Sequence, residues 1–339
     1  MHSKRSRLPI ARSTSRAPCN RPNPLTSKLR PVSCPVPGKG WNVPVGMPCR
    51  AKGSTAMTAV ERTDVGGLAT PYPLSAEHVR QYRENGHVHL RDVCTKSEVA
   101  EYREVLKSVT TERFAGASKM CDRPEDDFSR VFMQTFNLRE ADERAARFIQ
   151  SPRFGKIAAD LMGVDAVRIY YDKAMFKEPE SWITPWHQDG PHWPLHSDHV
   201  LTMWIPLVDA TIDMGPPRFA SGTHSCRILG PRGIHSESES FFHDYIRANR
   251  IPVLEEEIPA GDATLHSHWV VHGARANTSG RIREALGITF YEDGMVVDDS
   301  ACSAENRPVI DANLGNRRPG QRADHPRNQV VFARSWTVL

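Results

Sequence analysis

Two histidines, one aspartate and one arginine have the types and spacing of a metal site that also binds an acid. His187 and Asp189 are two residues apart, so on a β-strand both side chains project from the same face. Two imidazoles and one carboxylate hold a metal on one side and leave its other coordination positions open. This donor set is typical of non-haem Fe(II) oxygenases, in which a co-substrate and dioxygen take the open positions. His272 and Arg283 are the candidates for the third ligand and for the acid-binding residue.

Three downstream histidines compete for the place of the third ligand. His266, His268 and His272 share one strand parity, so parity alone does not choose among them. The turn-like segment 277–280 separates two β-like runs, and a hairpin centred between positions 277 and 278 would place His272 opposite Arg283.

The same hairpin register gives the other two histidines poor partners. His268 would face Gly287 and His266 would face Thr289, and neither partner offers chemistry. An imidazole on a metal beside an arginine fork instead suits a chelating keto-diacid, whose keto-acid end binds the metal and whose distal carboxylate binds the cation. The hairpin therefore predicts His272 as the third ligand.

Helical patterns precede the metal-binding segment. The run 75–85 resembles a helix that Gly86 ends as a C-cap, and a strand is expected at 87–93. Thr95 and Glu98 form a capping box for a second helix to about Val109. A third helical stretch, 140–162, is broken near 151–152.

Short β-like segments separated by turn residues follow Gly163. They lie at residues 166–176, 200–208, 218–221, 263–271 and 284–291, and one helical insert is expected at 238–248. Helices first and strands afterwards indicate an α+β fold with a mainly β core, a closed or double-layered antiparallel sheet.

The charge of the chain is distributed unevenly. The 339 residues include 44 Lys and Arg against 40 Asp and Glu, a formal net charge of +4. Residues 1–60 hold eleven of the basic residues, no acidic residue and nine of the 26 prolines, so residues 61–339 carry 33 basic and 40 acidic residues, a net −7. An acidic body offers no basic groove, which argues against a nucleic-acid substrate.

The chain divides into three expected parts. We interpret residues 1–70 as a disordered, basic, proline-rich extension that lacks the apolar surface to offset its ordering entropy. Translation is expected to start at Met57, and an organelle targeting segment is the alternative. Residues 71–300 are the expected oxygenase domain, and residues 301–339 are a lid or a tail.

The sequence contains no run of about 18 apolar residues, so no membrane span and no membrane partner are expected. Seven cysteines form no CxxC pair and are odd in number. This pattern argues against a disulfide scaffold and favours a cytoplasmic protein. The oligomeric state is not indicated.

Five segments carry a family resemblance: Trp186–Gly190, Leu201–Leu207, Arg218–His224, Gly261–His266 and His272–Arg283. Together they resemble the phytanoyl-CoA dioxygenase family of Fe(II)- and 2-oxoglutarate-dependent oxygenases, over about residues 72–300. The resemblance implies a double-stranded β-helix (jelly roll) with N-terminal flanking helices. It also implies iron bound by His187, Asp189 and His272, and 2-oxoglutarate bound by Arg283.

Five further residues bear on the co-substrate, the substrate or the turns beside them. By the same resemblance Trp204 lies near the co-substrate, and a core aromatic is the alternative. Ala274 stands where many members carry serine, which removes one hydroxyl contact to 2-oxoglutarate. Met214-Gly215 stands where Asn-Gly is usual, which affects a turn. Lys177 ends a strand that leads toward His187 and is a candidate contact for an acidic substrate group.

The resemblance implies a hydroxylase that couples O2-dependent oxidation of a small-molecule metabolite to decarboxylation of 2-oxoglutarate to succinate. Halogenating relatives replace the carboxylate with Gly or Ala, so Asp189 favours hydroxylation. A zinc-dependent hydrolase on the same ligand set is one alternative, but no candidate general base lies near the ligands in sequence and Arg283 would have no task. A non-catalytic jelly-roll binding module is another.

Overall fold

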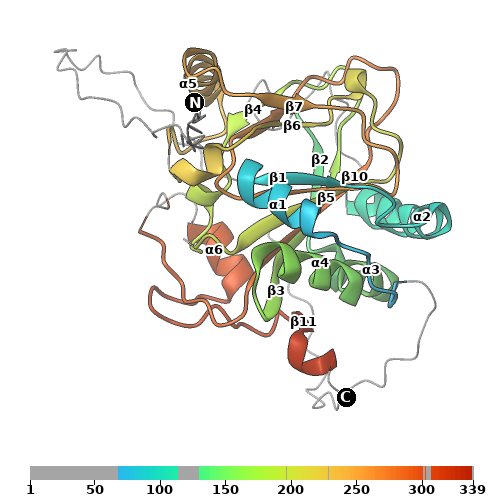
Figure 1. Cartoon of the computed structure of the whole chain (residues 1–339). Coiled ribbons are helices and arrows are strands. Elements are labelled where there is room, and N and C mark those ends of the chain that lie inside the picture. Colours follow the sequence, from blue (N-terminus) through green and yellow to red (C-terminus); the bar gives the residue numbers. More distant parts are fainter. Residues whose placement is uncertain are drawn as a thin grey trace, which may run out of the picture. The chain divides into compact units, whose positions relative to one another are not determined.

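The structure is a computed structural model that describes residues 68–113, 130–195, 197–227, 229–300, 302 and 307–337. Its centre consists of two antiparallel β-sheets (Figure 1). The larger sheet contains β1 (His87–Leu90), β2 (Met133–Phe136), β3 (Ala166–Phe176), β5 (Val200–Pro206), β8 (Ala263–Ser267), β10 (Ala285–Glu292) and β11 (Val330–Ala333). The smaller sheet contains β4 (Thr184–His187), β6 (Pro217–Ala220), β7 (Val253–Glu255) and β9 (His272–Ala274).

The strand orders show that both sheets are built from segments far apart in the sequence. The larger sheet has the order β1-β8-β5-β10-β3-β11, with β2 also paired to β3, and the smaller sheet has the order β4-β9-β6-β7. The two sheets face each other, since the ring of Phe219 on β6 lies 5.3 Å from the ring of His266 on β8. The predicted jelly-roll core with N-terminal flanking helices is confirmed.

Helices pack on both sheets, most of them on the larger one. The α-helices are α1 (Ala76–Asn85), α2 (Lys96–Arg113), α3 (Glu143–Ile149), α4 (Pro152–Met162), α5 (Ser236–Ala248) and α6 (Arg307–Leu314). Short 3₁₀ helices are η2 (Leu138–Glu140), η3 (Gly190–His192), η4 (Ile212–Met214), η5 (Thr223–Cys226) and η7 (Arg334–Thr337). On β10, Leu286, Ile288 and Phe290 pack in one apolar cluster with α4. The alternate residues Gly287 and Thr289 therefore face the space between the sheets.

Local capping explains where the N-terminal helices begin and end. The Ser75 hydroxyl accepts a hydrogen bond from the backbone N–H of His78, and Gly86 ends α1 with φ 78°. Before α2, the Thr95 hydroxyl accepts from the Glu98 backbone and the Glu98 carboxylate accepts from the Thr95 backbone. These helix boundaries agree with the prediction, as does the break between α3 and α4.

The hairpin predicted at positions 277 and 278 is wrong. β9 pairs with β4 and β6 in the smaller sheet, whereas β10 pairs with β3 and β5 in the larger sheet, so the intervening segment crosses between sheets. His272 lies opposite His187, and Arg283 lies opposite Lys177. The buried Asn277 side chain is the reason, because it donates to the carbonyl oxygens of Lys177 and Arg281 and so fixes the segment against residue 177.

The C-terminal segment also packs on the larger sheet. β11 pairs with β3 at the edge of the larger sheet, and Ile310 and Leu314 of α6 pack against a cluster that includes Tyr171 and Trp193. The predictions for residues 1–67 lie outside the described residues, and the lid role of 301–339 stays a prediction. Cys226 is disulfide-bonded, which the cysteine pattern did not predict. In the part of the chain that the structure describes, no helix is long and apolar enough to span a membrane.

The two faces of β10 make a stability test possible. Ile288→Ala removes a fully buried side chain on the helix-facing side and should lower the free energy of unfolding by about 2–5 kcal/mol, with metal binding retained. Val296→Ala, at a half-exposed position, should change it by less than about 0.5 kcal/mol. Urea unfolding followed by circular dichroism measures both, and a loss below about 1 kcal/mol for Ile288→Ala would contradict this packing.

Candidate active site

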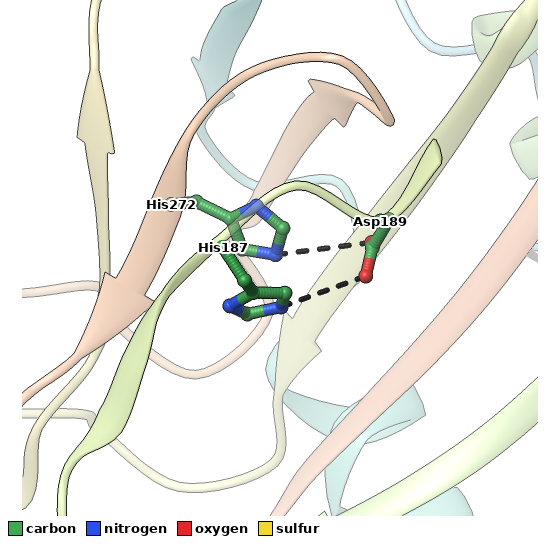
Figure 2. A group of neighbouring side chains, drawn as sticks. All are labelled: His187, Asp189 and His272. Carbon is green, nitrogen blue, oxygen red and sulfur yellow. Dashed lines mark ion pairs between the residues drawn. The ribbon is translucent and has the colours of Figure 1, made fainter. Parts of the chain in front are cut away.

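Three side chains converge at the interface between the two sheets. His187 ends β4, Asp189 follows two residues later, and His272 opens β9 directly opposite His187. The two imidazole centroids are 4.2 Å apart. Figure 2 shows both rings facing the Asp189 carboxylate, with Nε2–Oδ distances of 3.6 Å for His187 and 3.8 Å for His272. Each residue offers a ligand atom within 4.8 Å of the others, so this group could hold a metal ion.

Hydrogen bonds at the other ring nitrogens orient the two imidazoles. The Nδ1 atom of His187 lies 2.7 Å from the carbonyl oxygen of Pro185, and Nδ1 of His272 lies 3.1 Å from that of Val270. A carbonyl oxygen only accepts, so each Nδ1 carries the proton and each Nε2 keeps its lone pair toward Asp189. If both atoms bound one metal at bond lengths near 2.1 Å, each Nε2–Oδ distance would shorten by less than about 1 Å.

Burial sets the charge states that a metal requires. Burial, together with the adjacent His187 and His266, holds the pKa of His272 well below its usual value, so this imidazole is neutral at pH 7. Burial acts to raise the pKa of Asp189, but the neighbouring imidazoles, His272 first among them, and the Lys173 ammonium outweigh it and hold that pKa well below its usual value. Neutral imidazoles and an ionised carboxylate are the metal-binding forms.

The residues between and after the ligands fix the turn that carries Asp189. The Gln188 side-chain amide donates to the Arg227 carbonyl at 2.6 Å, and its oxygen accepts from the Leu229 backbone at 2.9 Å. The Gly190 N–H donates to the His268 carbonyl at 2.8 Å. A Cβ at Gly190 would lie 2.3 Å from the Trp269 ring, so a larger residue would displace the turn.

The other two candidate histidines differ in position. His268 points its Nδ1 toward the Val200 carbonyl at 2.9 Å and is not part of the ligand group. His266 lies opposite His87 and Thr202, not opposite Thr289 as the hairpin predicted. Its Nε2 is 3.7 Å from the Asp189 carboxylate, and neither ring nitrogen has a hydrogen-bond partner. The larger sheet thus adds a third imidazole to the site, which the sequence analysis had discounted.

The acid-binding candidate lies beside a buried apolar cluster that includes Trp204 and Met175. Arg283 is 2% exposed, and its guanidinium donates to the Gly215 carbonyl while Nε has no hydrogen-bond partner. Its Cζ lies 5.4 Å from the centre of the Trp204 ring and 5.6 Å from that of Phe132. Burial lowers the pKa of Arg283 to about 9, so the side chain is still a cation at pH 7. Trp204 and Arg283 were both predicted to lie near the co-substrate, and their side chains lie next to each other.

Strand register connects Arg283 with the metal-binding group. Thr202, registered with His266, is followed two residues later on β5 by Trp204, which is registered with Gly287 of β10. Arg283 precedes Gly287 on the same inward-facing side. Along the interior, Trp204 therefore lies between the ligand group and Arg283.

Several interior residues were missed by sequence reasoning. Tyr171, Lys173 and Met175 alternate on β3 and share the face of Lys177, a parity that the predicted strand 166–176 already contained. Burial lowers the pKa of Lys173, and Asp189 partly offsets this. Thr264, registered with Trp204, has a buried hydroxyl without a hydrogen-bond partner. Tyr171 and Lys173 thus lie near Asp189, and Met175 and Thr264 lie near Trp204.

Comparison with known proteins assigns the family. The family model for phytanoyl-CoA dioxygenase matches residues 82–285, and the chain belongs to this family. An ectoine dioxygenase of Stutzerimonas stutzeri (strain A1501) is 21% identical over 268 residues, which cover 73% of this chain and 86% of the relative. A 2-aminoethylphosphonate dioxygenase of the uncultured bacterium HF130_AEPn_1 is 23% identical over 217 residues, 63% of this chain and 80% of the relative. The predicted family and enzyme class are confirmed.

Solved structures share the fold. The non-heme alpha ketoglutarate dependent carbocyclase SnoK from nogalamycin biosynthesis is 26% identical, with a TM-score of 0.64 over 78% of this chain and all of that chain. EctD from S. alaskensis with bound Fe is 17% identical, with a TM-score of 0.55 over 68% of this chain and 81% of that chain, a likeness of fold alone.

The contact between β4 and β9 gives a test of the ligand geometry. A Cβ at Gly273 would lie 2.8 Å from the Thr184 carbonyl oxygen, so Gly273→Ala should force the strands apart and weaken metal binding at least about tenfold, as loss of ligand support does. Anaerobic titration with Fe(II), or with Co(II) as a spectroscopic probe, measures the affinity. Gly280→Ala is the control because nothing lies within 4 Å of its added Cβ. Unchanged affinity in Gly273→Ala would refute this role of the glycine.

Proposed function

We propose that this protein is an Fe(II)- and 2-oxoglutarate-dependent oxygenase that hydroxylates a small-molecule substrate. The observation that carries the proposal is the buried group of His187, Asp189 and His272, with Arg283 placed beyond Trp204 in the same interior. Solved structural relatives are named with the two predicted cofactors, iron and 2-oxoglutarate. One of them is the epimerase SnoN in complex with Fe3+, alpha ketoglutarate and nogalamycin RO.

The residues present fit iron and a keto-diacid. Two neutral imidazoles and one carboxylate are a donor set that leaves one side of the metal open. Buried polar atoms without hydrogen-bond partners face the same interior: Thr264 Oγ1, both ring nitrogens of His266, and Arg283 Nε. Unpartnered buried polar groups are costly in a protein that binds nothing, so their number at one place supports a polar ligand.

Each side chain has a defined task in this proposal. His187, Asp189 and His272 would hold iron, which supplies the oxidising chemistry when it is bound with 2-oxoglutarate and dioxygen. Arg283 would hold the distal carboxylate of 2-oxoglutarate and so orient the keto acid toward the metal. The walls formed by Trp204, Met175 and Phe132 exclude water, which strengthens the ion pair. No protein nucleophile or general base is needed.

Two further observations bear on the substrate class and the reaction outcome. Two relatives are named for ectoine and for 2-aminoethylphosphonate, which supports a small-molecule substrate here. Asp189 fills the coordination place that a halide would need, which supports hydroxylation over halogenation. A zinc hydrolase would leave the buried Arg283 without a task, and the relatives compared above are named as dioxygenases or as an alpha ketoglutarate dependent enzyme.

Metal dependence and one ligand substitution test the proposal. Fe(II) should support release of succinate from 2-oxoglutarate in the presence of a fractionated metabolite extract, and Zn(II) should not. Asp189→Ala should lower this rate by more than about 100-fold, since residues that merely support a ligand are already worth about 10- to 100-fold. Succinate is quantified by mass spectrometry.

A surface carboxylate provides the matched control. Asp244→Ala removes an exposed carboxylate on α5 and should leave the succinate rate unchanged. Activity that follows Zn(II), or an Asp189→Ala variant as active as the wild type, would rule out this function.

A further inference from the structure

A β-bulge precedes His187 in β4. The register of β4 against β9 shifts by one residue at this place, so Pro185 and Trp186 together lie opposite Gly273. A bulge leaves one residue out of the ladder and re-aims the side chains beside it. β4 is also an edge strand of the smaller sheet, so the polar groups on its outer side need partners other than a strand.

The peptide group between Pro185 and Trp186 has a partner at each end. The Trp186 N–H donates to Oε2 of Glu239, on α5, at 2.6 Å. The Pro185 carbonyl oxygen accepts from Nδ1 of His187 at 2.7 Å. This N–H and this carbonyl belong to one amide, and its resonance couples them electronically. A carboxylate is thus connected to a candidate iron ligand through a single peptide group.

The Glu239 carboxylate is held in place by its own contacts. Its other oxygen accepts from Arg218 at 3.3 Å, and the two side chains are 24% and 16% exposed. The Arg218 guanidinium lies over the Trp186 ring, 4.1 Å from its centre. Trp186 and Phe242 of α5 share a buried cluster, and α5 packs against β4 (Figure 1). The helix therefore presents a fixed carboxylate to the bulge.

The charge of Glu239 should affect the imidazole. A carboxylate that accepts from an amide N–H polarises the amide, so the carbonyl oxygen becomes a better acceptor, and hydrogen bonds in such a chain reinforce one another. A better acceptor at Nδ1 fixes the ring of a metal-binding histidine and raises the basicity of its other nitrogen. For His187 that other nitrogen is Nε2, which faces Asp189.

The second imidazole of the site has the same arrangement with a neutral partner. Nδ1 of His272 lies 3.1 Å from the Val270 carbonyl oxygen. The N–H of that peptide group, from Val271, donates to the Thr223 hydroxyl at 2.9 Å. The peptide behind His187 thus ends on an anion, and the peptide behind His272 ends on a hydroxyl. The shorter distance at His187 agrees with this difference, because charge-assisted hydrogen bonds are shorter.

We propose that Glu239 is a positioning residue for His187 and that it acts through the Pro185–Trp186 peptide group to make His187 the stronger of the two imidazole ligands. The inference rests on the proposed function, since it assumes that the site binds a metal. It adds a task for α5, whose carboxylate does not touch the metal-binding group but orients one of its members.

Glu239→Gln separates the charge from the hydrogen bond. Glutamine keeps an oxygen that can accept from the Trp186 N–H but carries no charge. The variant should bind Co(II) about tenfold more weakly than the wild type, as loss of an outer partner does, measured by anaerobic titration with visible absorption. Glu237→Gln is the matched control, because it removes the same charge from an exposed position in the first turn of the same helix, and it should match the wild type.

NMR of the Zn(II)-loaded protein with 15N-labelled histidine reads the two Nδ1–H groups separately. In the wild type the His187 proton should resonate downfield of the His272 proton, because a stronger hydrogen bond deshields it. Glu239→Gln should move the His187 resonance upfield and leave that of His272 in place. A glutamate with only a structural role would change the free energy of unfolding without this selective shift.

Other outcomes would overturn the inference. Unchanged Co(II) affinity in Glu239→Gln would show that the charge has no part in metal binding. Equal shifts of both histidine resonances would show an effect through space and not through the peptide group. If Glu239→Gln does not fold, the order of the two resonances in the wild type still decides, and a His272 proton downfield of that of His187 contradicts the proposal. Wild-type protein that binds neither Co(II) nor Zn(II) would instead refute the proposed function.

Discussion

The cross-strand pairing of His187 with His272 is the constraint on which the site depends. These residues are 85 positions apart in the sequence, yet the β4–β9 register places them directly opposite each other. The pairing is close because Gly273 lets the backbone of β9 approach that of β4. Asp189 reaches the two imidazoles because Gln188 and Gly190 tie its turn to the chain around His268 and Arg227.

The two sheets contribute different chemistry to one interior. The smaller sheet supplies the candidate metal-binding histidines His187 and His272, and the larger sheet and its flanks supply His266, Trp204, Lys177 and Arg283. Residues on the outer face of the larger sheet pack against the helices. Because side chains alternate along each strand, the residues that stabilise the fold and the residues of the site lie on opposite faces. The interior between the sheets holds polar atoms without hydrogen-bond partners, namely the His266 ring nitrogens, Lys177 Nζ and Arg283 Nε, and burial of the helix-facing core offsets their cost.

Much of the fold follows from local patterns, and the sheet crossing does not. Capping residues such as Ser75, Gly86 and Thr95 act within a few positions of themselves, and β3 coincides with the predicted segment 166–176. The segment after His272 looked like a hairpin because its turn residues are typical of one. Long-range contacts direct it to the other sheet, among them the hydrogen bond from the buried Asn277 to the Lys177 carbonyl and the backbone pair between Lys177 and Arg283. His272 and Arg283 were therefore selected for a geometric reason that the structure does not support, although both lie in the interior.

The position of the metal ion is the most direct measurement. A crystal structure of protein grown anaerobically with Fe(II) and 2-oxoglutarate, with anomalous data at the iron edge, locates it without reference to activity. The expected result is one iron peak bound by Nε2 of His187, Nε2 of His272 and the Asp189 carboxylate, with His266 outside bonding distance. A peak bound by His266 in place of His272, or no peak at this group, would contradict the assignment of the site.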